Sequence, residues 1–238
     1  VKALHNAGHK IAVLAPSTNH SAAGMRIPLM QPMELRERSD LLSEWDLNPK
    51  HSPIHLFELD GTPCDTVIVA MDGGLQHLIP NIQPQLVVSG VNLGPNLSQD
   101  SYHSGTMGAA REAGLYGMPA IASSFTSFDP AGMDKAIEAT VQLVERAMNV
   151  LPLVAANAGR PHDAMDTNYF TSWPRPGNDD GWLEDPNSAL LEAFKNGDLM
   201  LNLNVPPTWN GTWACTRLGV RWYRNAVRFD GTGDTEIA

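Results

Sequence analysis

A loop rich in glycine and asparagine, residues 90–103 (GVNLGPNLSQDSYH), is the part of the sequence best suited to bind a small ligand. It follows a short apolar run, Gln85–Ser89, that is typical of a buried strand. Its glycines let the backbone approach a ligand closely, and Asn92 and Asn96 offer neutral oxygen and nitrogen contacts. A ligand loop is one interpretation of this composition, and an ordinary turn-rich loop without a ligand is the other.

The residues Ser104, Gly105 and Thr106 directly follow this loop and are expected to begin a helix. The first N–H groups of a helix and its dipole favour an anion, so a phosphate-sized group is a reasonable ligand there. The alternative is that Ser104 serves only as the helix cap. Thr62 and Asp65 have the spacing of a capping box, and capping is the favoured interpretation over catalysis for both residues.

Three further residues lie in candidate loops and could take part in chemistry. His20 and His103 could act as acid or base, although a surface histidine without a role is the commoner outcome. Ser21 is an ordinary loop serine unless a second segment brings a cation near it.

Composition excludes several classes of function. The chain holds 16 basic and 26 acidic residues, a net charge of −10, and no basic run. This argues against binding a nucleic-acid polymer or a membrane surface. The sequence contains no P-loop, no G-x-S-x-G elbow and no H-E-x-x-H motif. Two cysteines, no signal peptide and no apolar run of 18 residues lead us to expect a cytoplasmic protein.

Strand-like and helix-like segments alternate along the first 150 residues. Strands are expected at 10–15, 54–59, 85–89 and 119–124, and helices at 1–6, 62–77, 104–117 and 129–150. This order predicts an α/β fold, a Rossmann-like and mostly parallel sheet with helices on both faces. Ligands of such sheets bind beyond the carboxyl ends of the strands, where the loops at 16–24, 90–103 and 124–129 would meet.

The remaining chain is less regular. Residues 151–186 hold five of the eighteen prolines and read as an irregular insertion within one domain, residues 1–238. A capped helix at 185–197 and strands at 199–205 and 213–218 are expected after it, while residues 25–53 suggest no clear element.

The block VVSGVNLGPNLSQDSYHSGTMGAAREA, residues 87–113, resembles the signature of the SurE family of stationary-phase survival proteins. The segments at 13–24, 58–67, 119–124, 201–206 and, more loosely, 216–227 resemble the family in the same order. The resemblance implies a divalent-metal-dependent phosphomonoesterase that hydrolyses nucleoside 5′- and 3′-monophosphates.

The resemblance also implies roles for individual residues. Its divalent ion, Mg²⁺ or Mn²⁺, would be held in part by Ser21 and Asn92. The phosphoryl group would be bound and activated by Asn96, Ser104 and Thr106, beside Gly105, Thr62 and Asp65. A homodimer or homotetramer is the expected assembly.

One part of the family pattern is missing from its expected place. The family's N-D-D-G metal loop follows a first strand that should precede Val1, and a last strand should follow Ala238. We therefore expect a fragment truncated at both ends, with weak or no activity of its own. The motif does occur at 178–181, but a proline-rich segment precedes it, which indicates a turn. The alternatives are a phosphatase of polyphosphate or another small phosphoester, and a non-catalytic member of the family.

Overall fold

A computed structural model describes residues 1–155, 185–220, 223, 227–229 and 235–237. The first part of the chain forms a three-stranded sheet of order β1-β3-β2, in which β1 and β3 are parallel and β2 is antiparallel to β3. Its elements are α1 (Lys2–Asn6), β1 (Ile11–Pro16), β2 (Leu35–Glu37), α2 (Asp40–Glu44) and β3 (Ile54–Leu59). Gly8 follows α1 with φ +89°, the left-handed conformation expected there.

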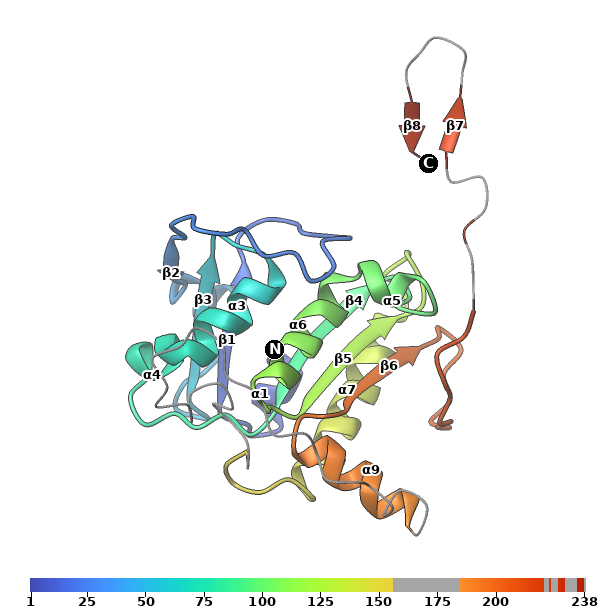
Figure 1. Cartoon of the computed structure of the whole chain (residues 1–238). Coiled ribbons are helices and arrows are strands. Elements are labelled where there is room, and N and C mark those ends of the chain that lie inside the picture. Colours follow the sequence, from blue (N-terminus) through green and yellow to red (C-terminus); the bar gives the residue numbers. More distant parts are fainter. Residues whose placement is uncertain (156–184, 221–222, 224–226, 230–234, 238) are drawn as a thin grey trace, which may run out of the picture.

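A second sheet, of order β4-β5-β6, is parallel throughout. Alternate residues of β5 face opposite helices, because Ala120 and Ala122 pack on α6 while Ile121 packs on α7. Both faces of this sheet are therefore covered, as predicted (Figure 1). The elements are β4 (Val87–Leu93), α6 (Gly105–Leu115), β5 (Ala120–Phe125), α7 (Met133–Met148) and β6 (Met200–Val205).

Shorter helices complete the description. The expected helix at 62–77 is present but kinked at Asp72 and Gly73, where the backbone leaves helical geometry. Asp185 caps α9, since its side chain accepts a hydrogen bond from Ser188 N. The elements are α3 (Pro63–Val69), η1 (Ala70–Gly74), α4 (Leu75–Leu78), α5 (Asp100–His103), α9 (Pro186–Lys195), β7 (Val227–Phe229) and β8 (Thr235–Ile237).

The α/β class with parallel strands and covering helices is confirmed, but the strands form separate sheets. Within the described residues β1 and β4 each have a paired strand on one side only, and both are partly exposed. The expectation of a buried strand at 85–89 was therefore wrong. The central β5 is buried along its whole length, because it has strand neighbours on both sides and helices on both faces.

Several boundaries differ from the expected ones. The strand expected at 85–89 spans 87–93, so Asn92 lies in the strand and not in the loop. Helix α7 begins four residues later than expected, because Asp129 and Gly132 form a turn before it. No strand forms at 213–218, where almost every residue is exposed and none is paired in a ladder.

Of the insertion expected at 151–186, residues 156–184 lie outside the described part of the chain, and so does the motif at 178–181. Among the described residues, no helix is long and apolar enough to cross a membrane.

Candidate active site

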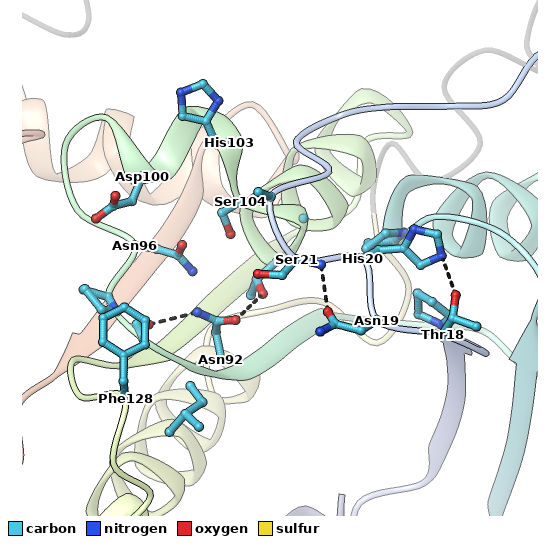
Figure 2. Close-up of a pocket in the computed structure, with 18 of the residues that line it drawn as sticks. Thr18, Asn19, His20, Ser21, Asn92, Asn96, Asp100, His103, Ser104 and Phe128 are labelled. Carbon is cyan, nitrogen blue, oxygen red and sulfur yellow. Dashed lines mark hydrogen bonds between the residues drawn. The ribbon is translucent and has the colours of Figure 1, made fainter. Parts of the chain in front are cut away.

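A cavity of about 750 Å³ lies at the carboxyl ends of β1 and β4 (Figure 2). Its wall is built from three separate segments, residues 16–22, 92–96 and 103–106, together with single residues from other loops. Eight of the residues singled out from the sequence meet here, namely His20, Ser21, Asn92, Asn96, His103, Ser104, Gly105 and Thr106. The loops expected to converge beyond the strands therefore do so.

The loop after β1 is held against α5 and α6 by two close backbone contacts. Gly24 N donates to His103 O over 2.6 Å. A Cβ atom added to Gly108 of α6 would lie 2.2 Å from Gly24 O, so only glycine fits at that position. Within the loop, Asn19 Oδ1 accepts from Ser21 N at 2.8 Å, and this local turn leaves the Ser21 side chain exposed at the cavity.

Asn92 lies at the end of β4, and two contacts orient its side-chain amide. Its Nδ2 donates to Gly94 O over 2.9 Å, and its Oδ1 lies 3.5 Å from Thr106 Oγ1. Asn92 and Ser21 line the same cavity (Figure 2). The amide oxygen of Asn92 is thus turned toward the start of α6.

Asn96 is 3% exposed, and both its side chain and its backbone are hydrogen-bonded. Its Nδ2 donates to Ser124 Oγ over 2.7 Å, and its backbone N donates to Asn204 Oδ1 over 2.9 Å. Its carbonyl accepts from Asn202 Nδ2 and Asn204 Nδ2 at 2.9 and 3.2 Å. This role of β6 was not predicted from the sequence, although two asparagines two residues apart in a strand share one face.

The N-terminus of α6 contributes the remaining polar groups. Ser104 caps this helix, since its Oγ accepts from Met107 N at 3.1 Å. Its hydroxyl hydrogen can still be donated to a ligand. Gly105 is buried where a Cβ atom would lie 2.9 Å from Pro63 Cγ and 3.3 Å from His20 O. The cap and the close packing together bring the first helical N–H groups to the cavity wall, where an anion is favoured.

Thr62 and Asp65 form the expected capping box of α3 and do not line the cavity. Thr62 N donates to Asp65 Oδ2 over 2.7 Å, and Thr62 Oγ1 lies 2.6 Å from Arg26 O and 2.8 Å from Asp65 Oδ2. Both residues are 3% exposed. The capping interpretation is therefore confirmed, and the substrate-binding role implied by the resemblance stays a prediction.

The two histidines lie at the edge of the cavity. His20 Nε2 is 3.1 Å from Thr18 Oγ1, and Figure 2 shows its ring turned toward Thr18, on the side away from Asn96. His103 is exposed at the end of α5. An acid or base role for either residue stays a prediction.

The charge around the cavity is unusual for a site that would hold an anion. Among the described residues that line it there is no lysine or arginine, and Asp100 is the single carboxylate. Asp100 Oδ1 contacts the Tyr223 hydroxyl, and its buried Oδ2 has no hydrogen-bond partner in the described structure. The sequence analysis did not select Asp100, although it lies within the loop at 90–103.

The donor set for a divalent cation is incomplete. Ser21 and Asn92 offer two neutral oxygens, and hard cations such as Mg²⁺ prefer carboxylate oxygens in addition. No group of three or more histidine, cysteine, aspartate or glutamate residues in the described part of the chain could hold a metal ion. These residues therefore do not make a metal site by themselves.

The fold and the cavity define an α/β protein with a polar cavity at the carboxyl ends of parallel strands. The family model described as Survival protein SurE matches residues 1–225, so the chain belongs to the SurE family. A 5′-nucleotidase SurE of Prochlorococcus marinus (strain AS9601) is 30% identical over 240 residues, covering 98% of this chain and 68% of that protein.

A second curated relative agrees with this assignment. A 5′-nucleotidase SurE of Anaeromyxobacter sp. (strain Fw109-5) is 35% identical over 229 residues, covering 95% of this chain and 66% of its own length. The crystal structure of the SurE protein from Aquifex aeolicus is 28% identical, with a TM-score of 0.48, and the match covers 62% of this chain and 54% of that one. The chain spans about two thirds of the length of these two curated relatives.

Proposed function

We propose that this chain carries the substrate site of a phosphomonoesterase that hydrolyses nucleoside 5′-monophosphates, and 3′-monophosphates as well, to nucleoside and phosphate. The observation that supports this most is the meeting of Asn96, Ser104 and Thr106 at the N-terminus of α6 in one cavity. The 5′-nucleotidase names of the relatives support the reaction class.

The residues of this chain would act by binding and orienting the phosphoryl group. The Ser104 hydroxyl and the first N–H groups of α6 donate to phosphoryl oxygens, and the fixed amide of Asn96 holds one side of the group. Donors that are already in place lower the barrier, because no reorganisation is needed as charge develops on those oxygens.

A divalent cation, Mg²⁺ or Mn²⁺, is part of the proposal. A dianionic phosphate beside Asp100, with no lysine or arginine in the described lining, requires positive charge from another source. Ser21 and Asn92 supply oxygens of the type that these ions accept. Because both oxygens are neutral, the proposal also requires additional carboxylate ligands beyond the described donor set.

The direct test is phosphate release from AMP in the presence of Mn²⁺. The experiment compares this chain with a form extended upstream of Val1, and it includes the Asn96→Ala variant of each form. Release from AMP that exceeds release from tripolyphosphate or glucose 6-phosphate, and that depends on Asn96, is the expected result. A preference for tripolyphosphate favours a different phosphatase, and no release from either folded form contradicts the enzyme proposal.

A cytoplasmic location and a homo-oligomeric assembly complete the proposal. Cys64 is buried and Cys215 is exposed, and both are free thiols, which suits a reducing compartment. In the described structure β7 and β8 pair only with each other, and a lone two-stranded hairpin is marginal in water. We propose that this hairpin is stabilised by packing on a second copy of the chain. Light scattering of the purified protein, which measures the mass of the assembly, tests this.

A further inference from the structure

An aromatic ring stands at one end of the cavity, and neither the sequence motifs nor the family assignment gives it a role. Phe128 is 80% exposed, although it lines the cavity. Leu93, also in the lining, is 42% exposed. Figure 2 shows the Phe128 ring on the Asn92 side of the cavity, away from His20. Phe128 and Leu93 thus add exposed apolar surface to a cavity that also contains Asn92, Asn96 and the start of α6.

The ring lies against the backbone of the same loop that carries the asparagines. A Cβ atom added to Gly94 would lie 2.7 Å from Phe128 Cε1, and Gly94 has φ +118°, so a side chain is excluded there. The ring therefore rests directly against a bare backbone segment. Its large exposed fraction shows that much of its surface remains open to a ligand.

The loop that carries Phe128 is itself fixed. Ser127 and Asp129 exchange two hydrogen bonds of 3.0 Å, between the Ser127 hydroxyl and the backbone N and O of Asp129. Asp129 Oδ1 accepts from Ala131 N at 3.0 Å just before α7. On the other side, Thr126 N donates to Val205 O over 2.9 Å. A ring on such a loop loses little freedom when a ligand stacks on it.

We propose that Phe128 is the stacking platform for the nucleobase of the substrate, with Leu93 beside it. This inference rests on the proposed function, since it places the base relative to the phosphate site at α6. A cavity of about 750 Å³ is much larger than a phosphate group needs. An exposed aromatic ring and a helix N-terminus that line the same cavity match the two parts of a nucleotide.

The apolar ring of Phe128 also determines how strongly the proposed site distinguishes one nucleobase from another. A phenylalanine ring has no hydrogen-bonding group, so it recognises the flat face of a base and not its edge. All four nucleoside monophosphates are therefore accepted, and purines, which offer more stacking area, bind more tightly than pyrimidines. Sugar phosphates without a base lose this contribution.

The test measures binding of three probes by calorimetry, AMP, ribose 5-phosphate and adenosine, so it does not depend on turnover. The variants are Phe128→Ala, Phe128→Trp and, as a control at an equally exposed apolar residue, Leu153→Ala. Because base stacking on an aromatic side chain typically changes affinity by about 5- to 150-fold, Phe128→Ala should weaken AMP and adenosine within that range. Ribose 5-phosphate should be unaffected, while Phe128→Trp retains AMP binding and Leu153→Ala changes nothing.

Equal AMP affinity in wild type and Phe128→Ala, or equal losses for AMP and ribose 5-phosphate, overturns the platform. Adenosine binding that depends on Phe128 without any binding of the two phosphates supports the platform and contradicts the proposed phosphate site instead. Failure of all three probes to bind the folded wild-type chain overturns both.

Discussion

At the scale of single residues, the site depends on side chains that fix the position of the residues proposed to bind the ligand. Asn96 could be selected from the sequence because it lies in a loop after a strand, but the partners that fix it could not. Asn204 and Asn202 are more than a hundred residues away, and their contact with Asn96 depends on the pairing of β5 with β6. Local sequence patterns contain no information about such pairing. The residues that position a site residue from another strand therefore cannot be predicted from a single sequence.

Replacing Asn204 by leucine tests this positioning role. Asn204→Leu removes the two hydrogen bonds to the Asn96 backbone, each worth about 1 kcal/mol. We expect a lower melting temperature and weaker binding of AMP and ribose 5-phosphate alike, because the Asn96 loop loses its fixed position. The control is Asn187→Leu at an exposed position of α9. Unchanged phosphate affinity in Asn204→Leu would show that Asn96 does not depend on β6.

Two substitutions at Ser104 separate capping from anion binding. Ser104→Ala removes the acceptor of the Met107 N–H group and should cost about 0.5–2 kcal/mol of stability. Ser104→Asp keeps a good cap but places a carboxylate where the phosphate is proposed to bind. Chemical denaturation should therefore report near wild-type stability for the aspartate variant, while calorimetry reports a loss of phosphate affinity of at least about tenfold. Retained affinity in Ser104→Asp contradicts an anion site at this residue.

At the scale of elements, the site requires the loop after β1 to touch α6. Gly108 permits this contact, since a Cβ atom there would meet Gly24 O at 2.2 Å. Helix propensity alone predicts that Gly108→Ala stabilises α6 by about 0.5–1 kcal/mol. We expect the opposite sign, a loss of about 1–3 kcal/mol, because the loop must move away from the helix. Thermal unfolding decides between the two, and a raised melting temperature contradicts the described packing.

The contact between α3 and α6 contains a buried carboxylate that makes stability depend on pH. Glu112 is 9% exposed, and burial, with Asp65 and Asp72 nearby, raises its pKa above the ordinary 4.5. The folded chain therefore binds this proton more tightly than the unfolded chain does. Its contribution to the unfolding free energy is fully present below the unfolded pKa and is lost as pH rises through the folded one.

Glu112→Gln removes this titration. The variant should gain stability relative to wild type at neutral pH, and its urea midpoint should change less between about pH 4 and pH 7. The exposed Glu138→Gln on α7 serves as the control. If wild type and Glu112→Gln keep a constant difference in midpoint across this range, Glu112 is not the titrating group.

The elements themselves could largely be predicted, because they rest on local signals. The capping residues Thr62 and Asp65 predict the start of α3, and the capping residue Ser104 predicts the start of α6. The start of α7 was misplaced, since apolar spacing at 133–148 extends the pattern into a turn that Gly132 closes. The end of β4 was misplaced because its glycine and its asparagine are typical of a loop, and Asn92 is in fact held by its pairing with β5.

At the scale of the whole molecule, the alternation of strands and helices predicts the class but not the division into sheets. Partner strands are chosen by long-range packing, so one sheet and two cannot be told apart from local patterns. Although β1 and β4 belong to different sheets, both strands end at the same cavity. The central claim is that this cavity binds a phosphate group at the start of α6.

The most direct test is an amide-resolved NMR titration of the isotope-labelled chain with AMP in the presence of Mg²⁺. The account predicts that the largest shifts fall on the backbone N–H groups of Gly105 and Thr106 and on the side-chain amide of Asn96. Shifts that concentrate outside the cavity, or none at saturating AMP, would contradict it.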